Sequence, residues 1–395
     1  MKRHLAAALL LLVALASCTP DNRPAAAKPT VSASPRVSAT ASVSPAPTAS
    51  PTDSPSPRPL EIPALASIQM VTARLGWAAG AGGVYATRDG IHWVQQFHSP
   101  EPVTGVDFID ASTGWVVGLQ RLYRTVDGGM HWSALPPMSK PLRTVHFASP
   151  QLGWGIAGGD TLVPTHGWLI ADSGGTLMKT ADGGASWNAL PAPVDAQTVC
   201  FTGPSNGWLG ARGGVYRSTD GGQSWHASLV RPDYSAAAYG QTTLIQCAGP
   251  MALWVDFQGG GAALSHSPYL AYATVDGKTW RLVLGEWYTE STILPQTAPY
   301  GPGSYPGSFS VVDPYDAAFL GDGPASLSVD MEMATQGGAV VTNSGSIHDA
   351  WWTAGASFAS RSTGWVIVGL NSGNAMAIKA TIDGGVHWSQ QLMEP

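Results

Sequence analysis

The fold is decided by the stretch Thr104-Gly-Val-Asp-Phe108-Ile-Asp-Ala-Ser-Thr-Gly-Trp115-Val-Val-Gly-Leu-Gln-Arg-Leu-Tyr-Arg-Thr125-Val-Asp127-Gly-Gly-Met-His-Trp132-Ser-Ala-Leu135. Its short apolar runs are separated by Gly, Asp and Ser, a pattern that predicts short β-strands joined by turns. We expect four strands, at 104–108, 114–118, 122–125 and 131–135. A four-stranded sheet of this length cannot bury both faces alone, so several such sheets must stack on one another.

The second half of this stretch recurs along the chain. Ser/Thr-x-Asp-Gly followed by Trp is found six times, four times at full length and twice one residue short. The Asp accepts hydrogen bonds from N–H groups of its own turn, and the Gly adopts backbone angles that other residues avoid. We therefore predict a structural role for the six aspartates, which are Asp89, Asp127, Asp182, Asp220, Asp276 and Asp383.

Each of these turns is preceded by an apolar residue with an aromatic residue seven positions later. The pairs are Met70/Trp77, Phe108/Trp115, Phe147/Trp154, Phe201/Trp208, Cys247/Trp254 and Phe358/Trp365. A seventh pair is predicted at Val312/Phe319, followed by an eroded turn at 334–341 in which Gln336 replaces the Asp. Seven units in this order predict an all-β, seven-bladed β-propeller of four-stranded antiparallel blades, with the first and last blades each complete in sequence. Eight blades are the alternative.

These repeats are similar to two known groups of propellers. The Ser/Thr-x-Asp-Gly turns with their Trp resemble the Asp-box (BNR) motif of sialidase-like propellers. The longer pattern, in which Phe-x-Asp-x₃-Gly-Trp-x-Val-Gly precedes the turn, resembles the Ycf48/Hcf136-like family over residues 68–392. That resemblance implies a scaffold or assembly factor that acts on membrane-associated proteins. The best-known setting of the family is the assembly of photosystem II.

The N-terminus predicts export and lipid anchoring. Lys2 and Arg3 precede an apolar run at 5–16, which is too short to cross a hydrocarbon core of about 30 Å. The run ends in Leu15-Ala-Ser-Cys18, which resembles the bacterial lipobox; that resemblance implies cleavage before Cys18 and diacylation of its thiol. Residues 18–62 are rich in Pro, Ser, Thr and Ala and cannot bury a core, so we expect a disordered tether. The predicted parts are a signal peptide at 1–17, the tether at 18–62 and the propeller at 63–395, held at the outer face of the cell membrane.

The composition argues against several classes of function. A net charge of −6 does not favour a nucleic-acid partner. The ten histidines lack the paired spacing of metal ligands, and the Gly-rich runs lack the strand–helix context of a phosphate-binding loop. We expect no cofactor, no metal and a monomer.

A binding site is predicted on one face of the propeller. The long connections, at 158–175, 229–243, 257–267, 282–308 and 321–328, should all open on the face opposite the Asp boxes, which we call the loop-rich face. Long loops on a rigid scaffold commonly bind ligands. The candidate binding residues are Trp168, Arg231, Tyr234, Tyr239, Glu286, Trp287, Tyr288, Tyr300 and Tyr305. Packing of the loops onto the scaffold is the other explanation for these aromatic residues, and the pair Trp351-Trp352 also lies outside the repeat pattern.

The favoured function is non-enzymatic binding of a protein or a glycan. The alternative is a sialidase-like glycoside hydrolase on the same face, which needs two carboxyl groups across its substrate, such as Glu286 with Asp233 or Glu290. The arginine cluster and Tyr–Glu nucleophile of a sialidase are not found in the sequence, so we predict no catalytic residue.

Two cysteines remain besides Cys18. Cys200 and Cys247 lie on the innermost predicted strands of adjacent blades, where their side chains either face each other or diverge. Export permits a disulfide, and the sequence leaves this pairing open.

Overall fold

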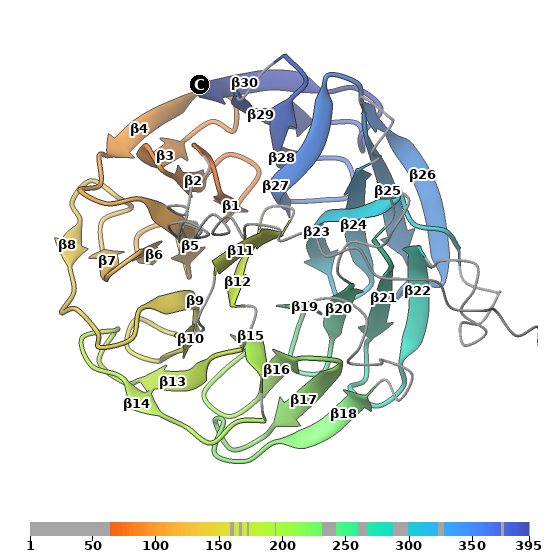
Figure 1. Cartoon of the computed structure of the whole chain (residues 1–395). Helices are drawn as coiled ribbons and strands as arrows, with labels where there is room; N and C mark the ends of the chain where they lie inside the picture. Colours follow the sequence, from red (N-terminus) through yellow and green to blue (C-terminus); the bar gives the residue numbers. More distant parts are fainter. Residues whose placement is uncertain are drawn as a thin grey trace, which may run out of the picture. The chain divides into compact units, whose positions relative to one another are not determined.

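The chain folds into a ring of seven β-sheets around a central axis (Figure 1). The computed structural model describes residues 64–158, 174–193, 195–230, 242–259, 267–286, 299–322, 328–372 and 375–394, and the backbone of 162–165 and 168–171. Each sheet has four antiparallel strands drawn from one continuous stretch of chain, which confirms the seven-bladed β-propeller. Within the described ranges there is no helix, and hence none that is long and apolar enough to cross a membrane.

Each blade runs in chain order from its innermost to its outermost strand. Blades 1 to 4 consist of β1 (Ser67–Met70), β2 (Gly76–Gly80), β3 (Gly83–Thr87) and β4 (Trp93–Phe97); β5 (Val103–Phe108), β6 (Gly114–Gly118), β7 (Leu122–Thr125) and β8 (Ser133–Ala134); β9 (Leu142–Phe147), β10 (Gly153–Ala157), β13 (Thr176–Thr180) and β14 (Asn188–Ala189); and β15 (Ala196–Phe201), β16 (Gly207–Ala211), β17 (Gly214–Ser218) and β18 (His226–Val230). Blades 5 to 7 consist of β19 (Thr242–Cys247), β20 (Leu253–Gln258), β21 (Tyr269–Thr274) and β22 (Arg281–Glu286); β23 (Tyr305–Asp313), β24 (Asp316–Asp322), β25 (Val329–Thr335) and β26 (Val340–Ile347); and β27 (Ala350–Phe358), β28 (Gly364–Leu370), β29 (Met376–Thr381) and β30 (Ser389–Glu394). A separate hairpin, β11 (Leu162–Thr165) and β12 (Trp168–Ala171), is inserted into blade 3.

Side chains on the innermost strands link every blade to the next. Gln69 accepts a hydrogen bond from the Phe108 N–H at 2.6 Å, and the hydroxyl of Ser357 accepts one from the Met70 N–H at 2.9 Å, which closes the ring between blades 7 and 1. We call this set the axial ring; its members, in blade order, are Gln69, Asp107, His146, Cys200, Gln246, Ser310 and Ser357. Each member bonds to the backbone or to a side chain of the following blade. Each blade keeps its own four strands, so these bonds link the blades into a closed ring.

The link between blades 4 and 5 is covalent. Cys200 of β15 and Cys247 of β19 face each other and form a disulfide, with sulfur atoms 2.11 Å apart and Cα atoms 6.0 Å apart. Cys247 takes the position that Phe108 has in blade 2, where the Phe stacks on the Trp of the preceding blade. At this seam a disulfide therefore takes the place of both the axial hydrogen bond and the aromatic stack.

Aromatic stacks fill the seams between the first four blades. The stacked pairs are Trp77–Phe108, Trp115–Phe147 and Trp154–Phe201, with ring centroids 3.5 to 3.6 Å apart. The indole N–H of Trp115 donates to the carbonyl oxygen of Gly183 in the next blade at 2.9 Å, so this fully buried ring leaves no unpaired donor. Such a pair combines a large buried apolar area with a satisfied polar group.

One predicted register in blade 6 is wrong by one residue. The sequence placed the seventh pair at Val312/Phe319, but Ser310 of β23 is the member of the axial ring, and it pairs with Ala318 of β24. The equivalent pair is therefore Val311/Ala318, with Ala in the position that Trp occupies elsewhere. A shift of one residue moves each side chain to the opposite face of a strand, so Phe319 packs toward blade 5 instead of blade 7.

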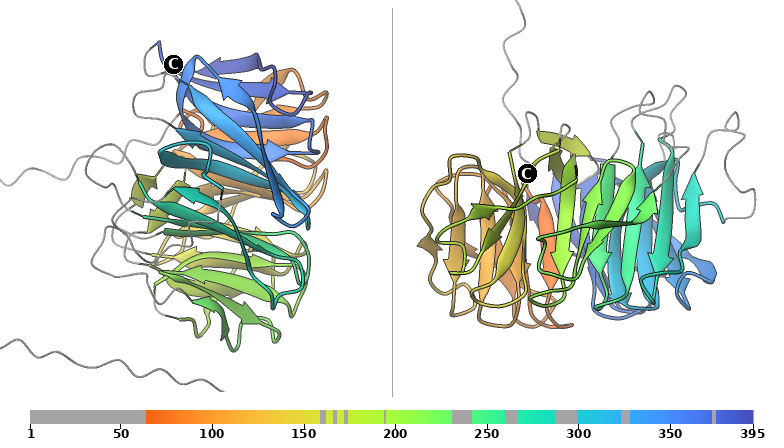
Figure 2. Two further views of the ribbon diagram at one scale, coloured as in Figure 1. Left: turned by 90° about the vertical axis from the view of Figure 1, so that its right-hand side faces the viewer. Right: turned by 90° about the horizontal axis from the view of Figure 1, so that it is seen from below.

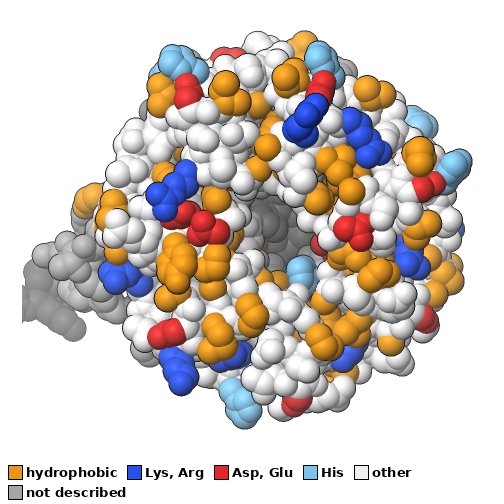
Figure 3. Space-filling view, turned by 180° about the vertical axis from the view of Figure 1, so that it is seen from behind, with side chains coloured by type: hydrophobic (Ala, Val, Ile, Leu, Met, Phe, Trp, Pro, Cys, Tyr) orange, Lys and Arg blue, Asp and Glu red, His pale blue; other side chains and the backbone are white. Residues whose placement is uncertain are grey.

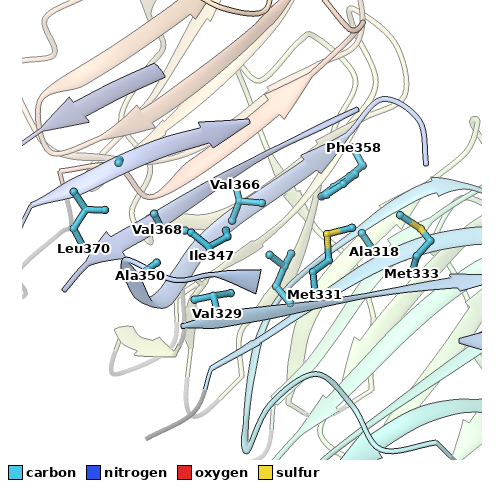
Figure 4. Packing of buried hydrophobic residues seen from close by; sticks show 12 residues of the cluster. Ala318, Val329, Met331, Met333, Ile347, Ala350, Phe358, Val366, Val368 and Leu370 are labelled. Atoms are coloured by element: carbon cyan, nitrogen blue, oxygen red, sulfur yellow. The ribbon is translucent and has the colours of Figure 1, made fainter. Parts of the chain in front are cut away.

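Aliphatic side chains take over at the seam between blades 6 and 7 (Figure 4). Met331 and Met333 of β25 lie beside the small Ala318 and face Val366 of β28, in the space that a Trp fills in other blades. Flexible Met side chains suit an irregular gap of this kind. This packing fixes β27, whose first residues reach the loop-rich face.

Candidate functional site on the loop-rich face

The Asp boxes use their aspartate carboxylates within their own turns. In blade 2, Asp127 Oδ1 accepts hydrogen bonds from the Thr125 hydroxyl and the His131 N–H, both at 2.9 Å, and Oδ2 lies 2.6 Å from His131 Nδ1. These hydrogen bonds lower the pKa of Asp127 to about 2. His131 thus still belongs to the turn, which is why β8 begins at Ser133 and is shorter than the predicted strand at 131–135.

The same hydrogen bonds recur around the face that these turns form. A Thr or Ser hydroxyl and backbone N–H groups bind the carboxylate in all six boxes, at Asp89, Asp127, Asp182, Asp220, Asp276 and Asp383. Figure 3 shows this face, with His and acidic side chains next to each other along its outer edge. The box carboxylates hold their turns together.

The opposite face carries the insertion of blade 3. The β11–β12 hairpin lies over the middle of the ring in Figure 1, and the right-hand view of Figure 2 places it on one face only. Trp168 is the first residue of β12. The hairpin that carries the candidate residue Trp168 therefore lies over the middle of the ring.

Three other candidates lie on the elements of blades 5 and 6 at the loop-rich face. Glu286 ends β22 and lies opposite Tyr269 in the ladder, and Tyr300 forms a parallel bridge with Gly285 beside it. Tyr305 begins β23, the innermost strand of blade 6. The Tyr300 side chain is 63% exposed, whereas those of Glu286 and Tyr305 are half-buried.

The segment 299–304 closes the seam between blades 5 and 6 from above. Gly301 N–H donates to the carbonyl oxygen of Gly285 at 3.1 Å, and the Tyr269 hydroxyl donates to the carbonyl oxygen of Gly303 at 2.9 Å. A Cβ atom on Gly303 would lie 2.6 Å from the backbone of Asp322 in blade 6, so only glycine fits at this contact. The segment therefore joins the two blades and covers what lies beneath it.

Buried acids lie beneath this cover. Burial raises the pKa of Asp256 to about 7. Burial and the nearby charge of Asp330 raise the pKa of Glu332 to about 7 as well. Asp256 Oδ2 accepts a hydrogen bond from Gln258 Nε2 at 2.9 Å, but Asp256 Oδ1 and Glu332 Oε2 have no hydrogen-bond partner among the described residues. Burial also raises the pKa of Tyr269 well above its usual value, and the charges of Asp256, Glu286 and Glu332 add to this.

These acids were not found from the sequence. Asp256 lies within the strand Leu253-Trp-Val-Asp-Phe-Gln258, where its alternation with Trp254 indicates a side chain that faces the same seam as the Trp. This alternation is the sequence signal from which a buried Asp256 could have been predicted. Among the described residues, no group of three or more His, Cys, Asp and Glu side chains is placed to hold a metal ion.

Several candidates lie outside the described residues. They are Cys18, Arg231, Asp233, Tyr234, Tyr239, Trp287, Tyr288 and Glu290. The binding role of these residues and the pairing of Glu286 with Asp233 or Glu290 stay predictions.

The sequence is similar to one family of known proteins. Residues 90–227 match the family described as Photosynthesis system II assembly factor YCF48. The photosystem II assembly lipoprotein Ycf48 of Synechococcus sp. (strain CC9902) is 34% identical over 136 residues, which cover 32% of this chain and 36% of that protein. The match thus spans about a third of the relative's length. The repeats of this chain resemble those of the Ycf48 family.

Solved structures share the propeller fold. An ancestral GH74 enzyme superposes with a TM-score of 0.56 and 16% identity over 84% of this chain and 47% of that one. The Cps50 (Swd1) propeller domain of Myceliophteria thermophila gives a TM-score of 0.52 and 6% identity, covering 80% and 96%. YCF48 from Cyanidioschyzon merolae gives 0.47 and 14% identity, covering 73% and 84%. At these identities the likeness concerns the fold alone.

Proposed function

We propose that this chain is a lipid-anchored, non-enzymatic propeller that binds a protein or glycan partner through its loop-rich face at the outer side of the cell membrane. The observation that carries the proposal is the contrast between the two faces. The box carboxylates are engaged within their own turns, whereas the other face brings the β11–β12 hairpin, Tyr300 and Tyr305 to the ends of a rigid ring. Binding residues on loops and strand ends of a rigid scaffold are the usual arrangement in propellers.

The family resemblance supports the same class of role. The matched relative is named an assembly lipoprotein, and a scaffold for membrane-associated proteins would need both a membrane anchor and an exposed binding face. Cys18 would supply the anchor, and the tether at 18–62 would let the propeller reach its partner. Photosystem II itself is not proposed as the partner.

A glycoside hydrolase is the alternative, because carboxyl groups with a pKa near 7 are suited to general acid catalysis at neutral pH. Asp256 and Glu332 have such pKa values. Asp256, however, is only 3% exposed and lies under the segment 299–304, so a sugar has no direct access to it. A hydrolase would have to rely on Glu286, at the edge of the site.

The experiment compares binding and turnover on the same protein. Full-length protein in detergent is incubated with membrane extracts and with chromogenic glycosides, beside Tyr300→Ala, Glu286→Gln and the control Tyr315→Ala. Tyr315 is 56% exposed in a turn of the box face. We expect partner capture that Tyr300→Ala weakens and Tyr315→Ala does not, without turnover. Turnover that Glu286→Gln abolishes would replace this proposal by the hydrolase.

A further inference from the structure

Trp351 is an exposed aromatic side chain that lies outside the repeat pattern of the propeller. It lies in β27, where Ala350 pairs with Leu370 and Trp352 pairs with Gly369, so Trp351 is the extra residue of a β-bulge. Its side chain is 53% exposed, which leaves roughly 100 Å² of aromatic surface in water. Bulges re-aim a side chain and are common next to binding sites.

The base of this side chain is rigid. The ring of Trp352 lies 6.4 Å from that of Trp351 at an interplanar angle of 83°, an edge-to-face contact. Trp352 itself packs into the core between blades 7 and 1, and a Cβ atom on Gly369 would meet it at 1.8 Å. A fixed ring below an exposed one gives a platform of set orientation.

Polar groups lie in the turn that precedes Trp351. Asp349, two residues before Trp351, is 60% exposed, and its carboxylate is paired with the ammonium of Lys379, which is only 8% exposed. The Asn371 N–H donates to the carbonyl oxygen of Asp349 at 3.0 Å, and its side-chain amide donates to the carbonyl oxygen of His348 at 3.3 Å. The turn at 348–349 is thus held in place, and its exposed carboxylate lies two residues before Trp351 in the chain.

We infer that Trp351 and Asp349 form a carbohydrate-binding subsite that takes a pyranose ring of a glycan. The C–H groups of one sugar face carry partial positive charge and suit the negative face of the indole. Sugar hydroxyls would donate to the fixed carboxylate of Asp349. A protein hot spot is less consistent with this surface, because the core of a protein interface is depleted of charged residues, whereas here His348 and Asp349 closely precede Trp351 in the chain.

This subsite lies on the same face as the proposed function and deepens it by naming a ligand class. β23 and β27 are neighbouring innermost strands, and the Ser308 N–H donates to the Thr353 hydroxyl at 2.8 Å. Their first residues, Tyr305 and Ala350, therefore reach the loop-rich face side by side. A glycan on Trp351 would extend toward Tyr305.

The test is a glycan array probed with the full-length protein in detergent. The array carries oligosaccharides of glucose, N-acetylglucosamine, galactose and mannose, and hits are quantified by titration calorimetry. We expect Trp351→Ala to weaken binding at least tenfold, Asp349→Asn to weaken it less, Trp351→Phe to retain part of it, and Tyr315→Ala to leave it unchanged. Unchanged unfolding temperatures of the variants show that they fold.

Two results would overturn the inference. One is that the wild-type protein binds no glycan on the array; the other is that Trp351→Ala binds as tightly as the wild type. A protein partner that is captured in a Tyr300-dependent manner, without any glycan binding, would remove the subsite and leave the proposed function intact. If the protein binds neither a glycan nor a protein on this face, both fail together.

Discussion

Replacing Asp256 by Asn removes a carboxyl group that the fold holds in its neutral form. The carboxyl is 3% exposed, and burial raises its pKa from 3.8 to about 7. This difference corresponds to about 4 kcal/mol between the two protonation states. Because the folded state binds the proton more tightly than the unfolded state, the wild-type protein loses this stability as the pH rises from about 4 to about 7.

The Asn variant has no proton to lose. Its amide resembles the protonated acid in shape, can still accept from Gln258 Nε2, and leaves one buried polar atom unpaired, as Asp256 Oδ1 already is. We therefore expect both proteins to be about equally stable at pH 4. At pH 8 the variant should be more stable, by an amount on the order of 4 kcal/mol.

The assay is urea unfolding at each pH from 4 to 8, with the free energy of unfolding of the variant compared with that of the wild type. Asp182→Asn is the matched control, since hydrogen bonds lower the pKa of this exposed carboxyl to about 2, and its side-chain partners Thr180 and Ser186 do not titrate between pH 4 and 8. Stability from a lowered pKa is fully present above the unfolded value, so the effect of this control should not change between pH 4 and 8. An Asp256→Asn effect that is equally constant with pH, or a variant that is less stable than the wild type at pH 8, would show that the fold does not hold Asp256 in its neutral form.

Three further predictions concern the packing and the anchor. Denatured, unreduced protein should show no free thiol at Cys200 and Cys247. Replacing both by Ser should lower the free energy of unfolding, measured by chemical unfolding, by about 4 kcal/mol, because the disulfide closes a 47-residue loop in the unfolded chain. Trp115→Ala should destabilise the protein by about 3–5 kcal/mol, because it empties a fully buried stack and leaves the carbonyl of Gly183 without its donor; a loss below 1 kcal/mol would show that the stack matters little. Cys18→Ser should move the protein from the membrane fraction to the soluble fraction on cell fractionation, and an unchanged distribution would exclude the lipid as the anchor.

The repeats allowed the fold to be predicted because each one is self-contained. Asp127 and its equivalents organise their own turns, so the sequence of a single box is enough to place a hairpin. The register of blade 6 could not be predicted in this way. Ala318 takes the place of the Trp, and the nearby Phe319 offers an aromatic residue at a plausible spacing on the wrong side of the strand.

The axial ring and the site depend on contacts between blades. Gln69 and Ser357 are both ordinary polar residues in sequence, and their shared role follows only from the neighbouring strand. The same holds for Cys200 and Cys247, which the sequence placed on adjacent strands without deciding whether they meet. Trp351 was noticed as a Trp outside the repeats, but its exposure depends on a bulge that no spacing rule predicts.

The most direct test of the account places a photo-crosslinking amino acid at position 300 on the loop-rich face, and in a second protein at position 315 on the box face, in cells that make the full-length chain. Both side chains are more than half exposed, at 63% and 56%, so access to solvent is matched. We expect a discrete crosslinked partner, protein or glycoconjugate, from position 300 and none from position 315. The same partner from both positions, or a partner from position 315 alone, would contradict the claim that the loop-rich face is where this propeller binds.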